Sequence, residues 1–167
     1  MLSARPLCPP GRRRETENPN IKAIPSTTGE PRWAGKDRMK SLVAEDDATN
    51  RKLLHTFLSR YGECDIAADG KEAVSAVRLA HQNHQNYDLI CMDIRMPKMD
   101  GQQAIQEIRK LEAASGIKMT ARIIMTTADT NMDSIASALL GRCNAYMVKP
   151  IDIANLKREL KALGLVQ

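Results

Sequence analysis

The sequence predicts an α/β fold with a doubly wound, five-stranded parallel sheet. Five short apolar runs recur along residues 39–167, and each is followed by a segment with the apolar spacing of an amphipathic helix. The runs are mostly apolar, as expected for strands that helices cover on both faces. Right-handed crossovers then leave few topologies, of which a doubly wound sheet is the commonest.

The first two strand–helix units are predicted within residues 41–80. Residues 41–44 form the first strand, and Asp47 is a suitable N-cap for the helix that follows, which Gly62 ends. A weaker strand covers residues 64–67, and Asp69 opens the second helix. The apolar helix faces consist of Leu53, Leu54, Phe57, Leu58 and Tyr61 in the first helix and of Ala73, Val74, Val77 and Ala80 in the second.

The other three units repeat this pattern. The strands are predicted over residues 89–92, 122–126 and 145–148. A helix runs from about Gly101 to Ala113, and a less regular one passes through Ile135, Leu139 and Leu140. The last helix begins at Asp152, turns Ile153, Leu156, Leu160 and Leu163 inward, and ends at Gly164.

Residues 1–38 are predicted to be a disordered, basic, proline-rich tail, and residues 39–167 the folded domain. The tail holds six of the eight prolines and lacks apolar periodicity, so it cannot bury enough surface to offset its ordering entropy. Residues 1–40 carry nine Lys/Arg and four Asp/Glu, whereas residues 41–167 carry sixteen of each. The domain therefore has no general attraction to nucleic acid. A second possibility is that translation starts at Met39.

Cysteine spacing and hydropathy favour a cytoplasmic protein. The four cysteines are far apart and form no metal-binding pattern, which suits a reducing compartment. No apolar run reaches the ~18 residues of a membrane span, and the N-terminus lacks the apolar region of a secretory signal. Only residues 165–167 follow the last predicted helix, so no DNA-binding domain is expected.

Polar residues follow the predicted strands where the strands end. Glu45-Asp46 follow the first strand, Asp93 the third, Thr127 the fourth and Lys149 the fifth. Because the carboxyl ends of parallel strands meet at one edge, these residues are expected to lie together. Crowded carboxylates repel one another, and Mg²⁺ would relieve this repulsion. Asp47 is a further acidic residue here, but a helix N-cap is its favoured role.

Such a site suits phosphoryl transfer. A carboxylate can attack phosphorus and form an acyl phosphate. The transfer needs neutralisation of charge more than covalent chemistry, so a metal ion, a lysine and a hydroxyl group suffice.

Over residues 39–165 the chain resembles the receiver domain of two-component response regulators. The similarity rests on four segments in the family's order, which are Glu45-Asp46, the run CMDIRMPKMDG at residues 91–101, Thr127-Ala128, and YMVKP at residues 146–150. The resemblance implies a flavodoxin-like fold with strand order 2-1-3-4-5. It also implies a stand-alone regulator that takes a phosphoryl group from a histidine kinase or a histidine phosphotransfer domain, then docks to a downstream protein or relays the phosphate.

The resemblance implies that Asp93 is the phosphoacceptor. Asp46 and Asp93 would ligate Mg²⁺ directly, and the backbone carbonyl of Arg95 would complete the protein ligands. Glu45 would contact the ion mostly through water.

The resemblance also assigns the residues that respond to phosphate. Thr127 would donate a hydrogen bond to the phosphoryl group, Lys149 would pair with it, and Tyr146 would swing inward as Thr127 moves. The protein would catalyse only its own phosphorylation and dephosphorylation.

Three positions depart from the family's pattern. Arg142 stands where the family usually has glycine, with Gly141 one residue earlier, so the exit from the preceding helix is open. Arg95 and Asp129 flank the expected phosphoryl position, which leaves its lifetime open.

Two other functions remain. A Mg²⁺-dependent phosphohydrolase of the aspartyl-phosphate type would need an acidic residue two places after its nucleophile, where this chain has Arg95. A degenerate receiver acting as a constitutive interaction module is disfavoured because all the phosphorylation residues are present.

Overall fold

Five parallel strands form the centre of the fold in a computed structural model that describes residues 21–23, 38–117, 119–128 and 142–167. Across the sheet these strands are β3 (Gly62–Ala67), β2 (Met39–Ala44), β4 (Leu89–Asp93), β5 (Arg122–Thr127) and β6 (Ala145–Val148). Numbered along the chain, these strands have the order 2-1-3-4-5. The predicted flavodoxin-like fold is therefore confirmed.

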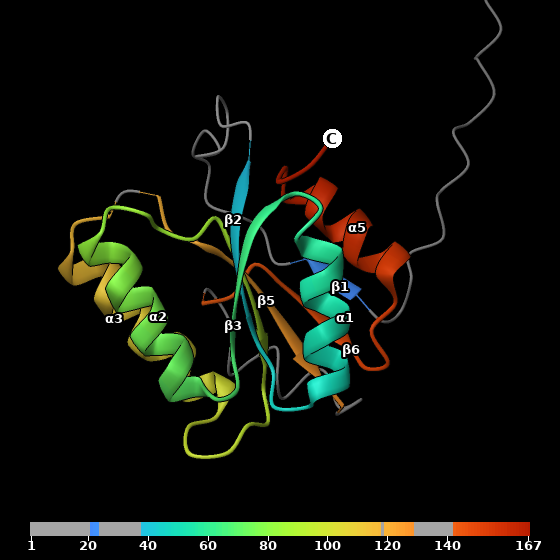
Figure 1. Cartoon of the computed structure of the whole chain (residues 1–167), viewed down its shortest axis with the longest axis horizontal. Coiled ribbons are helices and arrows are strands. Elements are labelled where there is room, and N and C mark those ends of the chain that lie inside the picture. The colour runs from blue at the N-terminus through green and yellow to red at the C-terminus, as the bar shows by residue number, and fades with distance from the viewer. Residues whose placement is uncertain (1–20, 24–37, 118, 129–141) are drawn as a thin grey trace, which may run out of the picture.

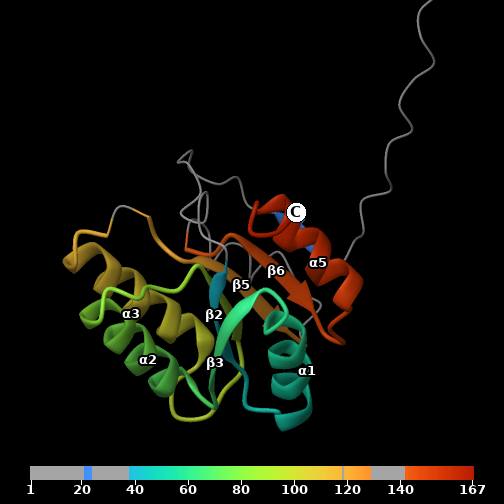
Figure 2. The same ribbon diagram turned by 45° about the horizontal axis from the view of Figure 1, so that its top comes forward.

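Helices cover both faces of the sheet (Figures 1 and 2). The helices α2 (Gly70–Gln82) and α3 (Gly101–Ala114) lie on one face, and α1 (Ala48–Leu58) and α5 (Ile153–Ala162) lie on the other. Each begins after an aspartate whose side chain accepts a hydrogen bond from a first-turn amide. These caps are Asp47, Asp69, Asp100 and Asp152. The helix predicted through Ile135, Leu139 and Leu140 lies outside the described residues.

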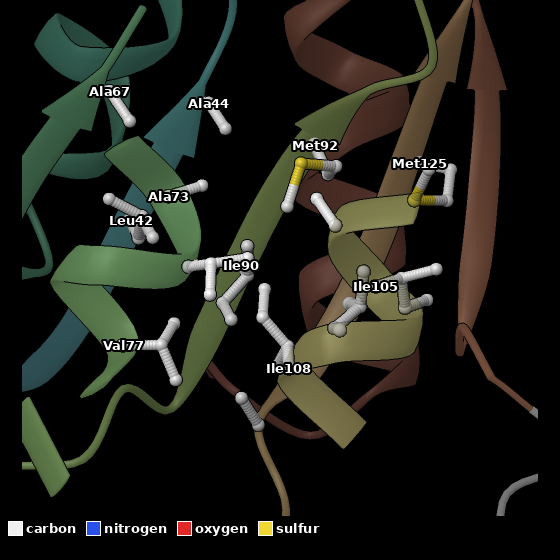
Figure 3. Packing of buried hydrophobic residues seen from close by; sticks show 14 of the residues in the cluster. Leu42, Ala44, Ala67, Ala73, Val77, Ile90, Met92, Ile105, Ile108 and Met125 are labelled. Atoms are coloured by element: carbon white, nitrogen blue, oxygen red, sulfur yellow. The ribbon is translucent and has the colours of Figure 1, made fainter. Parts of the chain in front are cut away.

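The core forms two layers, one on each side of the sheet. Neighbouring strand residues point to opposite faces, so Leu42 packs toward α2 and α3 while Val43 packs toward α1 and α5. Figure 3 shows the first layer, in which Ile90 and Met92 of β4 meet Ile105 and Ile108 of α3. Burial of both faces explains why the central strand β4 is apolar without alternation as far as Asp93, whereas the edge strand β3 is only partly buried.

The first helix differs from its prediction at three residues. It ends at Leu58, so Tyr61 lies beyond the helix, and Gly62 instead opens β3 with a φ of +154°. A Cβ atom at Gly62 would overlap the carbonyl oxygen of Met39, so the close approach of β2 requires glycine there. Leu53 was expected on the apolar face but is 40% exposed. It lies beside the buried stripe, which consists of Leu54, Phe57 and Leu58.

A sixth strand extends the sheet at its β6 edge. The strand β1 (Ile21–Ala23) pairs antiparallel with β6 and places Lys22 opposite Tyr146. This corrects the prediction of a disordered tail at residues 21–23; residues 1–20 and 24–37 lie outside the described residues. Three residues are too few to show a strand pattern, and their pairing depends on backbone groups that an edge strand leaves unpaired.

Within the described residues, no helix combines the length and the apolar character needed to cross a bilayer.

Candidate functional site

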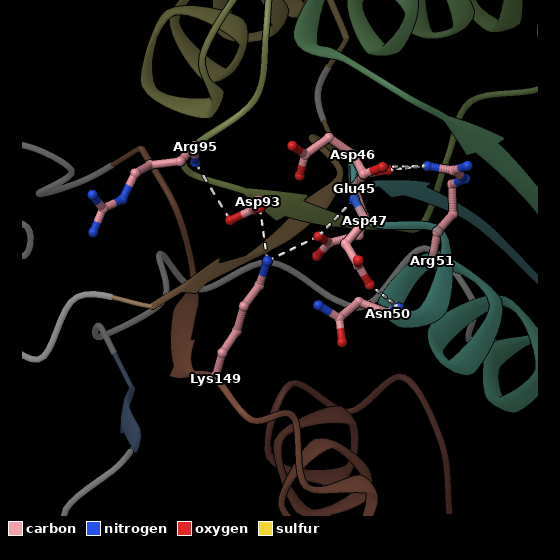
Figure 4. Close-up of polar contacts among 8 residues, drawn as sticks. All are labelled: Glu45, Asp46, Asp47, Asn50, Arg51, Asp93, Arg95 and Lys149. Atoms are coloured by element: carbon pink, nitrogen blue, oxygen red, sulfur yellow. Dashed lines mark hydrogen bonds and ion pairs between the residues drawn. The ribbon is translucent and has the colours of Figure 1, made fainter.

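The last residues of two strands and the first residues after two others bring the predicted site residues to one edge of the sheet. Glu45 directly follows β2, Asp93 is the last residue of β4, Thr127 is the last of β5, and Lys149 directly follows β6. Figure 4 shows the side chains of Glu45, Asp93 and Lys149 converging. The sequence prediction that these distant segments meet is confirmed.

Lys149 bridges two buried carboxylates. Its Nζ lies 2.7 Å from Oδ2 of Asp93 and 2.8 Å from Oε1 of Glu45. Burial opposes the charge of the lysine, but hydrogen bonds to the two carboxylates outweigh it and raise the pKa of Lys149. The ammonium group is therefore charged at neutral pH and pairs with both carboxylates.

Glu45 is held in an unfavourable setting for a carboxylate. It is fully buried, and burial is the largest cause that raises its pKa, with the charge of Asp93 adding to it and the hydrogen bond from Lys149 opposing it. Its second oxygen, Oε2, is buried and has no hydrogen-bond partner among the described residues. Such an oxygen is costly to bury unless a cation or a donor reaches it.

The acidic residues fit a hard divalent cation. Glu45, Asp46 and Asp93 each offer a carboxylate oxygen, and these oxygens lie within 4.8 Å of one another. Asp46 is exposed, so the group opens to solvent. An oxygen-only donor set with room for water is what Mg²⁺ prefers. The buried Oε2 of Glu45 is a further sign that a cation suits the site.

The backbone of Arg95 lies beside Asp93. Its amide points at Oδ1 of Asp93 across 3.4 Å, whereas its side chain is exposed and extends away from the carboxylate (Figure 4). This arrangement suits the predicted use of the Arg95 backbone rather than its guanidinium group. The ligand role of the carbonyl stays a prediction.

Asp47 caps a helix, as the sequence favoured. Its Oδ1 accepts a hydrogen bond of 2.8 Å from the amide of Asn50. One turn into α1, Arg51 donates to the carbonyl oxygens of Glu45 (2.6 Å) and Asp46 (3.0 Å) and so fixes the backbone of the acidic pair. Sequence reasoning missed Arg51, although its position four residues after the cap placed it within reach of this loop.

Thr127 and Tyr146 are both buried. The carbonyl oxygen of Thr127 accepts a hydrogen bond of 2.7 Å from the amide of Lys149, which couples the ends of β5 and β6. Tyr146 lies opposite Met125 in the sheet and is 1% exposed. Tyr146 is therefore buried in this structure. Its movement and the contact of Thr127 with phosphate stay predictions, and Asp129 and Gly141 lie outside the described residues.

Comparison with known proteins places these residues in a family. The family model of the response regulator receiver domain matches residues 42–161. The chain belongs to this family. The match covers most of the part that folds around the sheet and includes all of the acidic, hydroxyl and lysine positions described above.

Relatives and solved structures agree with this assignment. The chain is 36% identical over 123 residues to hybrid signal transduction histidine kinase M of Dictyostelium discoideum, which covers 73% of this chain and 5% of that protein. The crystal structure of the receiver domain of the histidine kinase CKI1 from Arabidopsis thaliana, complexed with Mg²⁺ and BeF₃⁻, is 27% identical with a TM-score of 0.64. It covers 75% of this chain and 92% of that one.

A further structure holds a receiver domain with a partner. It is the co-crystal structure of the Saccharomyces cerevisiae phosphotransfer protein Ypd1 with the receiver domain of its downstream response regulator Ssk1, at 26% identity and a TM-score of 0.66. The similarity covers 77% of this chain and 90% of that one. This chain spans between 4% and 48% of the length of four curated relatives.

In this receiver domain, the backbone at Arg142, where the sequence departs from the family's pattern, is held by a side chain of α3. Arg109 donates to the carbonyl oxygen of Arg142 through Nε (2.9 Å) and to that of Ala121 through Nη1 (3.0 Å). Glu112 holds the same Nη1 at 2.6 Å and accepts from the amide of Ala121. The chain just before β6 is therefore fixed from α3 at the position where the family usually has glycine.

Proposed function

We propose that this receiver domain accepts a phosphoryl group on Asp93 in a Mg²⁺-dependent reaction. The observation that carries the proposal is the bridge of Lys149 between Asp93 and Glu45, beside three carboxylate oxygens that lie within 4.8 Å of one another. A nucleophilic carboxylate, a fixed ammonium group and a cation site are the parts that phosphoryl transfer needs.

The residues divide the work as follows. An oxygen of Asp93 attacks the phosphorus of a phosphohistidine, the phosphorus–nitrogen bond breaks, and the imidazole leaves with the electron pair. Asp46, Asp93 and the Arg95 carbonyl would hold Mg²⁺, with Glu45 contacting it through water, and the ion would neutralise charge on the phosphoryl oxygens. Lys149 then pairs with the phosphoryl group, and Thr127 donates a hydrogen bond to it.

A histidine kinase or a histidine phosphotransfer domain is the proposed donor. The co-crystal of the related Ssk1 receiver domain with the phosphotransfer protein Ypd1 supports a donor of this class. The output would be binding to a downstream protein or relay of the phosphate to another histidine. A cytoplasmic location fits the free thiols of Cys64, Cys91 and Cys143.

We infer that the domain acts only on its own phosphoryl group rather than as a phosphohydrolase of other substrates. A phosphohydrolase of the aspartyl-phosphate type needs an acid two residues after the nucleophile, where Arg95 directs its side chain away from Asp93 (Figure 4). One phosphoryl group per chain is expected, without multiple turnover of unrelated phosphate esters.

Phosphotransfer from a labelled histidine phosphotransfer protein, such as Ypd1, tests the proposal. We expect the parent protein to take up label with Mg²⁺ and not with EDTA, and Asp93→Asn to take up none. Asp100→Asn is the matched control, because Asp100 caps α3 and asparagine caps equally well. Equal labelling of Asp93→Asn and the parent would contradict the proposal, as would metal-independent labelling.

A further inference from the structure

A side-chain tether joins the loop after Asp93 to the start of α2. Lys98 lies in this loop, and its Nζ is 2.6 Å from Oδ2 of Asp69. The Asp69 side chain is 2% exposed, whereas that of Lys98 is 61% exposed. The ion pair therefore has one end fixed inside the protein and the other reaching in from solvent.

Asp69 is a rigid anchor for this pair. Its Oδ1 caps α2 by accepting a 2.9 Å hydrogen bond from the amide of Glu72, which leaves Oδ2 for Lys98. The hydrogen bond from Lys98 is the main cause that lowers the pKa of Asp69. A carboxylate held by a helix amide and paired with a cation loses little further freedom, so the contact restrains the loop rather than the carboxylate.

The backbone next to Lys98 is held by the same helix. The amide of Gly70 donates to the carbonyl oxygen of Met99 at 3.1 Å, and a Cβ atom at Gly70 would overlap that oxygen. Lys98 itself has a φ of +62°, in the left-handed region that residues other than glycine seldom adopt. Two contacts from α2 therefore support a backbone conformation that the loop sequence alone does not favour.

The other end of the loop is fixed at the sheet. The amide of Ile94 donates to the carbonyl oxygen of Thr126 (2.9 Å), and the amide of Gly101 donates to that of Ile94 (2.8 Å). Along the loop, Arg95 lies between Ile94, which is bonded to the sheet, and Lys98, which is paired with Asp69. The ion pair of Lys98 therefore also restrains the backbone of Arg95, which faces Asp93.

We propose that Lys98 is a positioning residue whose ion pair with Asp69 holds the loop so that the Arg95 backbone is presented to the divalent cation. The inference rests on the proposed function only for the presence of that cation. It adds a residue outside the acidic cluster that raises the affinity for Mg²⁺ without touching the ion.

The direction in which Mg²⁺ affinity changes when Lys98 loses its charge distinguishes a positioning role from a purely electrostatic one. Lys98 carries a positive charge near a cation site, so removing that charge would by Coulomb's law strengthen Mg²⁺ binding. Loss of a positioning contact has the opposite effect, because the loop must then be ordered when the ion binds. Weaker binding after removal of the charge is therefore diagnostic.

The experiment titrates the full chain with Mg²⁺ alone, without a phosphodonor. Calorimetry gives the dissociation constant, and the NMR shift of the Arg95 amide locates the binding. We expect Lys98→Met to raise the dissociation constant roughly threefold to fivefold, the effect of losing one partly exposed ion pair. Lys110→Met is the control, because it removes a 2.7 Å pair with Glu107 on the exposed face of α3, and it should change nothing.

Two further variants identify the partner. Asp69→Asn keeps a good helix cap but loses the charge, and it should weaken Mg²⁺ binding as Lys98→Met does. The double variant should be no weaker than either single variant, because both remove one contact. Amide exchange at Gly70 should rise in Lys98→Met, while the metal-free variant still unfolds in one cooperative transition.

Each outcome decides between the claims. Unchanged or tighter Mg²⁺ binding by Lys98→Met, additive losses in the double variant, or an equal loss in Lys110→Met would overturn the inference and leave the proposed function standing. If the parent protein itself binds no Mg²⁺, the proposed metal site fails, and the inference with it. Weaker binding in Lys98→Met and Asp69→Asn alone supports the inference.

Discussion

Lys149 and Asp93 form an ion pair of 2.7 Å at the centre of the site. The same ammonium group lies 2.8 Å from Glu45, so one lysine neutralises two carboxylates that a divalent cation would also use. Lys149 therefore has two opposing effects. It competes electrostatically with the cation before reaction, and it is placed to pair with the phosphoryl group afterwards.

Replacement of Lys149 by methionine should raise the affinity for Mg²⁺. A unit charge about 4 Å away interacts with ~4 kcal/mol at an effective dielectric constant of ~20, so even partial screening leaves an increase of roughly tenfold. Calorimetric titration measures it, with Lys157→Met on the exposed side of α5 as the control. Weaker Mg²⁺ binding by Lys149→Met would show that the lysine does not compete with the ion. The opposite sign is expected for Lys98→Met.

Binding of a phosphoryl mimic at Asp93 should change the environment of Tyr146. The Lys149 amide donates to the Thr127 carbonyl, and Lys149 directly follows β6, the strand that contains Tyr146. Beryllofluoride binding at Asp93 should therefore shift the NMR signals of Thr127 and Tyr146. Lys149→Ala should let the site fill while the Tyr146 signals stay in place, since a ligand shifts only the equilibria it distinguishes. Shifts confined to the loop after Asp93 in the parent protein would contradict this coupling.

The Asp69–Lys98 pair should make stability sensitive to acid. The folded protein holds the pKa of Asp69 below its ordinary value of 3.8, so the ionised carboxylate stabilises the fold above that pH and loses this contribution as the pH falls through the folded value. Urea unfolding should show the parent to be more stable than Asp69→Asn at pH 6. The difference should shrink toward pH 3, and a constant difference over this range would rule out the charge as its cause.

Removal of residues 1–38 should expose the edge of β6. The backbone pairing of the three residue pairs between β1 and β6 is lost, which should lower the free energy of unfolding. Self-association should also increase, because an uncovered edge strand can pair with another chain. Removal of residues 1–20 alone keeps β1 and serves as the control. Identical urea midpoints and elution volumes for the two truncations would mean that β1 does not protect the edge.

The strands and helix starts were largely predictable because local signals determine them. Apolar runs indicated β4 and β6 to within one residue, and Asp47 and Asp152 marked helix starts that the structure confirms. The end of α1 was predicted too late. Gly62 is present because β2 passes close to it, and that contact is between segments more than twenty residues apart.

The site was predictable for residues at strand ends and not for residues that reach it through side chains. The fold carries Asp93 and Lys149 to one edge whatever their side chains do, so the topology was enough to predict their meeting. Lys98 and Arg51 reach their partners through long side chains whose direction depends on the folded backbone. The pairing of β1 likewise depends on an exposed strand edge, which has no signature in the three residues that occupy it.

The acyl phosphate on Asp93 is the most direct test of the whole account. The full chain is treated with acetyl phosphate and Mg²⁺, and the product is reduced with borohydride, which converts an aspartyl phosphate to homoserine that peptide mass spectrometry can locate. We predict homoserine at position 93 alone, dependent on Mg²⁺ and absent from Asp93→Asn. Modification at Asp46 or Asp47 instead, or no modification of the parent protein, would contradict the central claim.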